Sequence, residues 1–295
     1  MSATAWILLI TLSILWGGSF FFAEIALKQL GPLTIVAARV AIGAGCLIVF
    51  LCFAGLRLPR DGRTWRQYFI MGGLNNALPF ALIVWGQVHL TSGVASILNA
   101  TTPLFTVLVA HAFTADERIT ANKLTGVLVG IVGVAILMGS EALSSLGGAE
   151  LPAQFAILGA AISYAFASVY GRRLRGQPTS VAATGMLCCS TVLLLPLAFV
   201  FESPLAVVPN SEVILSLLGL GLLSSSLAYL IYFRILELAG ATNLMLVTLL
   251  VPISALVLGV LILHESIPLS AYIGMLVIFG GLACIDGRLI RMLKR

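Results

Sequence analysis

An ionisable pair interrupts the apolar stretch LILHESIP at residues 261–268. His264 and Glu265 are residue types that can ligate a metal ion or act together as general acid and base. A zinc site needs three or four ligands, and the chain has only His89 and His111 as further histidines. The pair is therefore favoured as a polar joint between two buried helices, and neither a metal nor a catalytic residue is expected.

Motifs for nucleotide use and for proton relays are missing from the sequence. No G-x-x-x-x-G-K-[ST] pattern occurs, which argues against ATP as a partner. The carboxylates fall at expected helix ends or in loops, whereas intramembrane proton relays use Asp, Glu or His at membrane depth. His89 lies by the outer end of an expected span, far from mid-membrane. These observations predict a protein that works without a cofactor and without obligatory proton coupling.

The composition identifies the solvent in which these residues must act. Charged residues make up 9% of the 295 residues, and 60% are apolar, whereas a soluble domain carries about a quarter charged residues. The mean hydropathy is +1.12. Because so few polar groups cannot cover a water-exposed surface, most of the chain is expected to lie in lipid.

Lipid permits only helices or closed barrels to span, since every backbone polar group must be bonded within the protein. The apolar runs at 94–113 and 124–138 are unbroken, which does not fit the alternation of barrel strands. A crossing helix needs about 20 residues. We expect ten spanning helices, near residues 5–24, 33–55, 66–88, 93–113, 121–139, 152–172, 180–201, 211–234, 241–263 and 269–289.

Lys and Arg are concentrated in alternate loops, which orients the helices. With the N-terminus in the cytoplasm, the basic residues of that side are Arg57, Arg60, Arg63, Arg66, Arg118, Lys123, Arg172, Arg173, Arg175, Arg234, Arg288, Arg291, Lys294 and Arg295. The outer loops hold Lys28 alone, and Arg39 lies within a span. Such an excess marks the cytoplasmic side, so both termini are predicted there. The net charge of +5 therefore gives no reason to expect a nucleic-acid partner.

The two halves of the chain share a pattern of Pro, Glu and Gly. Glu117 follows Pro103 by fourteen residues, and Glu265 follows Pro252 by thirteen. Glycines stand nine and sixteen positions after each glutamate, at Gly126 and Gly133 and at Gly274 and Gly281. The offset between the two glutamates is 148 residues, about half the chain. This spacing indicates an internal repeat.

The repeat predicts three segments: a five-helix unit at 1–139, a Ser/Gly-rich linker at 140–151 and a second five-helix unit at 152–295. Because five is odd, the second unit enters the membrane with the opposite orientation. Inverted repeats of this kind are typical of secondary transporters. The expected fold is therefore an all-α membrane protein with ten transmembrane helices in two inverted five-helix repeats.

The doubled pattern of Pro, Glu and Gly, together with LSILWGGSF at 12–20, resembles the drug/metabolite transporter superfamily. More closely, the whole chain is similar to the EamA-type ten-helix transporters, which include amino-acid and metabolite exporters. The resemblance implies a multi-pass protein of a bacterial-type inner membrane that functions as a monomer. The residue before each glutamate, usually Gly in the family, is Asp116 or His264 here.

Polar and aromatic residues near mid-span are the candidates for a substrate cavity, because such a cavity needs a few hydrogen-bonding groups and aromatic walls. They are Trp16, Asn75, Asn76, Gln87, Asn99, Thr102, Tyr164, Ser225, Tyr229 and Asn243. Pro79, Pro103 and Pro252 are predicted to kink or gate their helices. Arg39 either snorkels outward or faces the cavity and attracts a carboxylate.

Several candidates also have a packing interpretation. The serines at 224–226 can bond to their own backbone or across helices, and Trp16 can belong to the core. An Asn pair is costly to bury without partners, which favours a wet cavity for Asn75 and Asn76. Gly126, Gly130 and Gly133 are expected to form a helix-packing face.

Two classes of function remain open. The favoured class is a secondary transporter, not an enzyme, that exports or exchanges a small metabolite such as an amino acid by alternating access, as a facilitator. The alternative is a membrane-embedded enzyme acting on a lipid, although such an enzyme is expected to cluster His, Asp or Glu at one membrane face. A channel-like pore is a third possibility, and saturation of the flux distinguishes it.

Overall fold

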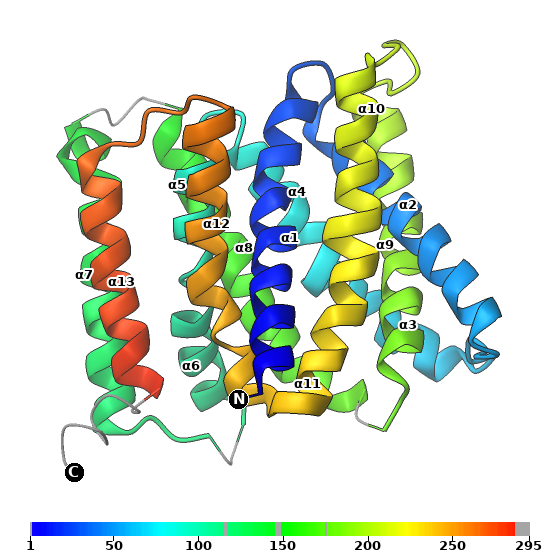
Figure 1. The fold of residues 1–295 in the computed structure, drawn as a ribbon, viewed down its shortest axis with the longest axis horizontal. Helices are drawn as coiled ribbons and strands as arrows, with labels where there is room; N and C mark the ends of the chain where they lie inside the picture. The colour runs from blue at the N-terminus through cyan, green and yellow to red at the C-terminus, as the bar shows by residue number, and fades with distance from the viewer. Residues whose placement is uncertain (1, 115–116, 145–148, 175, 287–295) are drawn as a thin grey trace.

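The protein is a bundle of helices (Figure 1). The computed structural model describes residues 2–114, 117–144, 149–174 and 176–286, and within these ranges it contains no strand. Eight helical stretches are long and apolar enough to cross a membrane, and Val247–Ile262 and Leu269–Ile285 are shorter apolar helices. The all-helical membrane fold expected from composition is therefore confirmed.

The elements follow one another with short connections. They are α1 (Ala3–Leu27), α2 (Pro32–Phe53), α3 (Gly62–Gly72), the π-helix η1 (Gly73–Ala77), α4 (Leu78–Gly86), α5 (Ser92–Asn99), α6 (Thr102–Phe113), α7 (Ala121–Ser144), α8 (Glu150–Tyr170), the 3₁₀ turn η2 (Gly171–Leu174), α9 (Thr179–Phe201), α10 (Ser211–Leu218), the π-helix η3 (Gly219–Leu227), α11 (Ala228–Leu244), α12 (Val247–Ile262) and α13 (Leu269–Asp286).

Local sequence explains where several helices begin. Side-chain oxygens of Ser2, Asp61, Thr91 and Asn210 accept backbone N–H bonds at the starts of α1, α3, α5 and α10. Such N-caps satisfy donors that have no partner within the helix. Pro32 lies in the first turn of α2, where a missing N–H costs little.

The two ends of the bundle are called the lower and upper faces, as they appear in Figure 1. The lower face holds the start of α1 and the end of α13. The upper face holds the connections that follow α1, α4, α9 and α12. Successive spans alternate in direction between these faces.

The helices at one edge of the bundle, α7 and α13, form an antiparallel pair (Figure 1). A Cβ atom at Gly126 would lie 2.5 Å from the carbonyl oxygen of Gly281, and one at Gly274 would lie 2.7 Å from that of Gly133. Only glycine fits at such close approaches, so the packing role expected for Gly126 and Gly133 is confirmed. The contacts are reciprocal, which is the pattern that a twofold axis between the helices produces.

Two π-helical segments were not foreseen from the sequence. The offset of 148 residues carries η1 at Gly73–Ala77 onto residues 221–225, within η3 at Gly219–Leu227. π-Helical turns are rare and are frequent at functional sites. Both halves therefore carry the same irregular element at the same register.

The eighth span is longer than expected. The helix expected at 211–234 continues to Ala239. Gly240 then breaks α11 with φ of 75°, a conformation that glycine adopts without strain. A short helical stretch at 241–244 follows this break and leads into α12 at Val247, so a helix does begin near 241, where the ninth span was expected.

Candidate functional site

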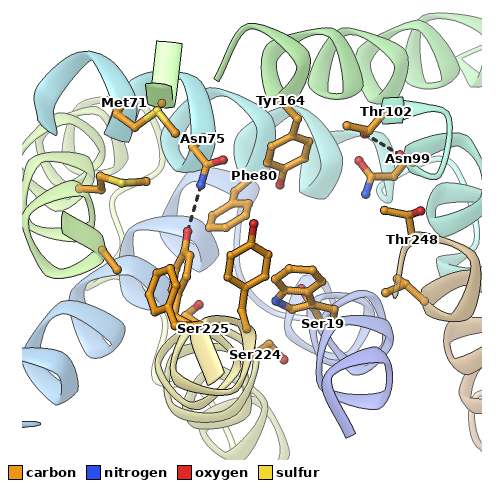
Figure 2. Close-up of a pocket in the computed structure, with 18 of the residues that line it drawn as sticks. Ser19, Met71, Asn75, Phe80, Asn99, Thr102, Tyr164, Ser224, Ser225 and Thr248 are labelled. Atoms are coloured by element: carbon orange, nitrogen blue, oxygen red, sulfur yellow. Dashed lines mark hydrogen bonds between the residues drawn. The ribbon is translucent and has the colours of Figure 1, made fainter. Parts of the chain in front are cut away.

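A cavity of about 580 Å³ lies at the centre of the bundle (Figure 2). Its wall is formed by residues of α1, α2, α3, η1, α4, α5, α6, α8, η2, α9, η3, α11 and α12. It extends to the lower face, because its wall includes residues of the connection between α8 and α9. Gly171 and Leu174 lie in η2, Gly176 and Gln177 follow it, and the neighbouring wall residue Thr179 is the first residue of α9. Toward the upper face the wall ends at residues such as Phe20 and Ile83.

One carboxylate caps α5 at the upper face. The backbone N–H groups of Ser92 and Gly93 donate to Glu265 over 2.8 Å and 3.1 Å. A carboxylate at a helix N-terminus is stabilised by the unpaired N–H groups and by the helix dipole. Gly259 permits this approach, since a Cβ atom there would lie 2.4 Å from Glu265 Oε2. Glu265 is thus a structural joint between the α12–α13 connection and α5. The sequence favoured a structural role for this residue but did not predict α5 as its partner.

A second carboxylate does the same for α2. Glu202, in the connection after α9, accepts bonds from the N–H groups of Leu33 at 2.9 Å and Thr34 at 2.7 Å. The Thr34 hydroxyl adds a third bond of 2.8 Å. Glu202 and Glu265, called the two carboxylate caps below, therefore tie loops of the second half to helices of the first.

A buried amide lies beside these caps. Gln87 donates from Nε2 to the carbonyl oxygen of Phe20 at 2.9 Å and to Glu24 at 3.4 Å. Its Oε1 has no hydrogen-bond partner within the described ranges. Gln87 thus connects α1 to the end of α4 near the upper face and does not line the cavity, in contrast to the sequence-based expectation.

The lower face has a different arrangement. Glu117, in the connection before α7, pairs with Arg172 at the end of α8. Both side chains are partly exposed, and no backbone N–H in the described part of the chain donates to Glu117. The helices α9 and α12 begin at this face without a side-chain cap.

A polar cluster forms one side of the cavity. Asn75 Nδ2 donates to the hydroxyl of Tyr229 at 3.0 Å, as the dashed line in Figure 2 shows. The Tyr229 hydroxyl donates to Asn76 Oδ1 at 2.9 Å, and Asn76 Nδ2 donates to Ser190 at 3.4 Å. Asn75 therefore faces the cavity, whereas Asn76, which is fully buried, stands behind it. Both asparagine side chains therefore have hydrogen-bond partners within the protein.

Across the cavity lie Asn99, Thr102 and Thr248 (Figure 2). The hydroxyl of Thr102 donates to the carbonyl oxygen of Asn99 at 2.7 Å. The side-chain oxygen Asn99 Oδ1 has no hydrogen-bond partner in the part of the chain that the structure describes. It is therefore available to a ligand that donates a hydrogen bond.

Most residues expected at the cavity do lie on its wall. They are Trp16, Asn75, Asn99, Thr102, Tyr164, Ser225 and Tyr229, together with Arg39 and Pro252. Asn243 is not among the wall residues, because it lies near the lower face and donates to the carbonyl oxygen of Ala239 at 2.8 Å. Pro79 follows η1 and Pro103 follows the break between α5 and α6, and neither lies on the wall.

Arg39 points inward and does not snorkel to the upper surface. It is 6% exposed and lies on the cavity wall. Its guanidinium donates to Ser225 at 3.0 Å and to Ser19 at 2.9 Å, and it lies over the Phe80 ring, 3.7 Å from the centroid. Ser19 and Phe80 were not foreseen as wall residues, since an isolated Ser and Phe in apolar helices carry no distinguishing signal.

The serines of η3 combine the two roles that the sequence left open. Ser224 and Ser225 lie on the wall. Ser224 also donates to the carbonyl oxygen of Leu15 in α1 at 2.6 Å, and Ser226 donates to that of Gly43 in α2 at 3.1 Å. The segment 224–226 thus both packs against neighbouring helices and contributes to the cavity wall.

The fold and the cavity define a class: a multi-pass helical membrane protein with a central, largely apolar cavity that extends to the lower face. Comparison with known families is more specific. The chain belongs to the EamA-like transporter family, whose model matches residues 3–139 and 151–285. The family expected from the sequence motifs is therefore confirmed.

Individual relatives span nearly the whole chain. The uncharacterized transporter YoaV of Bacillus subtilis is 27% identical over 280 residues, which cover 93% of this chain and 94% of that protein. A protein of Streptantibioticus cattleyicolor described as a probable terminal-alkyne amino-acid exporter is 26% identical over 290 residues, 98% of this chain and 95% of its own length. A solved crystal structure matches with a TM-score of 0.70 at 21% identity, covering 98% of this chain and 99% of that one, which shows the shared fold.

Proposed function

We propose that this protein is a secondary transporter that exports or exchanges small metabolites, with amino acids as the first candidates, across a bacterial inner membrane. The observation that carries the proposal is a central cavity that opens at the lower face and is closed at the upper face by the two carboxylate caps. The relative described as an amino-acid exporter supports testing amino acids first.

The lower face is taken to be cytoplasmic. The excess of Lys and Arg in the connections at that face supports this orientation, and it places both termini inside. A cavity open to the cytoplasm suits a protein that loads its substrate there for export. All ten apolar helices then cross the membrane, α12 and α13 included, and one chain contains a complete cavity, as expected of a functional monomer.

The reciprocal glycine contacts between α7 and α13 support two inverted five-helix repeats. In such a protein, the second half can adopt the conformation of the first while the first adopts that of the second. This exchange would give the protein a second conformation, in which the upper face is open. In that conformation, the caps of the upper face are released and Glu117 caps the lower-face helix that begins near residue 240.

Transport by facilitation is supported by the chemistry of the cavity wall. Among the described wall residues there is no Asp, Glu or His, so none of the usual proton carriers faces the substrate. His89 lies exposed at the upper face, next to Trp85. Substrate gradients are therefore expected to drive net flux.

Counterflow in proteoliposomes tests the proposal. Vesicles that contain the full chain are loaded with one unlabelled compound from a panel of amino acids, nucleosides and organic cations, and uptake of the same labelled compound is followed. We expect saturable exchange of one or more amino acids, and empty vesicles serve as the control. Flux that does not saturate indicates a pore, and conversion of a lipid without any flux would establish the enzyme alternative.

A pH gradient imposed without a substrate gradient tests facilitation separately. We expect no uphill accumulation. Accumulation that is present in the wild type and absent in His89→Ala would overturn facilitation and identify His89 as the coupling residue.

A further inference from the structure

Arg39 is a buried cation without an acidic partner among the residues that the structure describes. It lies on α2 at the wall of the cavity and is 6% exposed. Within the described ranges, the salt bridges are Arg172–Glu117 and Arg234–Glu237, and Arg39 takes part in neither. A charged side chain at membrane depth costs a few kcal/mol and is typically retained for function, facing a cavity or an ion pathway. An unpaired guanidinium at a cavity wall is suited to a ligand that brings the negative charge.

The guanidinium is held in place with donors to spare. Its Nε donates to Ser225 and its Nη1 donates to Ser19, while its plane lies against the Phe80 ring. Ser225 has no hydroxyl proton left for a ligand, because it donates that proton to the carbonyl oxygen of Leu220 at 2.9 Å. Of the five N–H groups of an arginine, two are used in these bonds. The rest can meet a planar anion in bidentate fashion.

Two hydroxyl groups add to this donor set. Ser19 accepts a bond from Arg39, and no acceptor for the proton of its own hydroxyl is found among the described residues. Tyr164, which lies within electrostatic range of Arg39, has a hydroxyl without a hydrogen bond in the described part of the structure. Figure 2 shows this hydroxyl pointing into the middle of the cavity. Positive charge and hydrogen-bond donors therefore converge on one region.

The rest of the wall limits the charge and shape of the ligand. Arg39 is the one cationic side chain among the described wall residues, so a dianion such as phosphate would remain half neutralised. The described wall also has no carboxylate, so it offers no ion pair to a cationic amine that lacks a negative charge of its own. Trp16 and Tyr232, whose ring centroids are 5.8 Å apart, provide an apolar surface.

We propose that the cavity binds organic monocarboxylates with an apolar body, and that Arg39 is the residue that binds the carboxylate, assisted by Ser19 and Tyr164. Amines and amides that lack the carboxylate are excluded. This inference deepens the proposed function, because it takes the cavity to be the transport site, and it specifies the substrate class independently of flux.

The alternative is a purely structural arginine that joins α2 to α1 and η3 through Ser19 and Ser225. In that case the loss of Arg39 lowers the stability of the protein without changing its preference among ligands. Binding measurements on matched ligands separate the two roles.

The experiment measures the thermal unfolding midpoint of the full chain in detergent at increasing ligand concentration, since a ligand of the folded state raises that midpoint. Four six-carbon probes differ in head group alone: hexanoate, L-norleucine, L-norleucinamide and hexylamine. Inorganic phosphate at equal ionic strength is the fifth probe. We expect hexanoate, L-norleucine or both to stabilise the wild type, and the amide, the amine and phosphate to leave it unchanged.

Variants then assign the binding to Arg39. Arg39→Gln is expected to weaken carboxylate binding about tenfold or more, as the loss of charge-assisted hydrogen bonds requires. Ser19→Ala keeps the charge and is expected to weaken binding about threefold. Thr11→Ala is the matched control, because Thr11 lies on the same helix as Ser19 but outside the cavity wall, and its hydroxyl donates to the carbonyl oxygen of Ile7. Its carboxylate affinity should equal that of the wild type.

The possible outcomes are distinct. Stabilisation by the amide or the amine, failure of both carboxylates in the wild type, or unchanged carboxylate affinity in a folded Arg39→Gln would overturn the inference. If Arg39→Gln does not fold, the wild-type ligand series and Ser19→Ala decide. Binding of hexanoate without L-norleucine supports the inference and contradicts amino acids as substrates, whereas amino-acid exchange that persists in Arg39→Gln supports the proposed function and contradicts the inference.

Discussion

Glu265 and Glu117 occupy equivalent positions in the two halves of the chain, 148 residues apart, yet they have different partners. Glu265 caps α5 through the N–H groups of Ser92 and Gly93. Glu117 pairs with Arg172 and caps no helix in the described part of the structure. The same offset carries Ser92 onto residue 240, where Gly240 interrupts α11 with a positive φ. Equivalent glutamates thus belong to a closed face and an open face.

Glu202, the other long-range cap, also differs from its equivalent position at the lower face. Glu202 ties the start of α2 to the second half at the upper face. The equivalent start of α9, at the lower face, has no side-chain cap. Carboxylates that accept backbone N–H bonds from the other half are therefore found at the upper face. At the lower face Glu117 bridges the halves through the side chain of Arg172, and helices begin uncapped or with a local cap such as Asp61. This difference indicates that the caps hold one end of the cavity shut.

Glu265→Gln is expected to have the largest effect. Loss of the charge removes part of the stabilisation of the α5 N-terminus, so the ratio of open to closed upper face should rise about tenfold. Pulsed electron paramagnetic resonance between spin labels at His89→Cys and Ser266→Cys, both on exposed upper connections, measures the opening as a longer distance. The five native cysteines are replaced first.

Glu212→Gln is the matched control for this prediction, because Glu212 is an exposed carboxylate in the first turn of α10 at the same face. It should leave the distance distribution unchanged. An equal shift in both variants would mean that general surface charge, and not the cap, controls the upper face.

Glu117→Gln is expected to have a smaller effect on the present conformation. The pair with Arg172 is partly exposed, and such pairs contribute about 0–1 kcal/mol. The distance between labels at 89 and 266 should therefore stay as in the parent. The exchange rate in proteoliposomes should fall, because the conformation with the upper face open loses its cap. Opening of the upper face by Glu117→Gln would contradict the assignment of the two glutamates to opposite ends.

The smallest expected effect concerns Asp61, which caps its own helix and serves as a local reference for the two carboxylate caps. The Thr64 N–H donates to its carboxylate at 2.8 Å and lowers the pKa of Asp61 below the ordinary value of 3.8. Because the folded pKa is the lower one, the stabilisation is present above the unfolded value and is lost as the pH falls through the folded pKa. Titration of the Asp61 side chain by carbon NMR should give a midpoint below 3.8. A midpoint at or above that value would show that the cap is absent in solution.

The sequence was sufficient for the all-helical membrane fold, the family and most of the cavity wall. Long apolar runs identify helices because lipid leaves few alternatives, and the doubled glycines identified the packing face of α7 and α13. Trp16 and Tyr164 were predicted as wall residues because a substrate cavity needs aromatic walls and both lie near mid-span.

Two features of the site could not be predicted from the sequence: the orientations of Asn76 and Gln87, and the contacts between residues far apart in the chain. Asn76 and Gln87 were expected at the cavity because they are polar residues within a span, but the π-helical turns of η1 change which side chains face the cavity. The cap of α5 joins residues 173 positions apart, and no local pattern reveals such a contact. The surroundings of Arg39 depend likewise on Ser19 and Ser225, which lie on different helices.

The central claim is that the cavity is open at one face at a time. Thr102→Cys, in the cysteine-free background, places a thiol on the cavity wall at mid-membrane. A small charged methanethiosulfonate reagent is added from either side of oriented vesicles. We expect rapid modification from the lower face and slow modification from the upper face, and about tenfold faster modification from the upper face when Glu265→Gln is added. Equal and rapid modification from both faces in the parent, or an upper-face rate that Glu265→Gln leaves unchanged, would contradict the account.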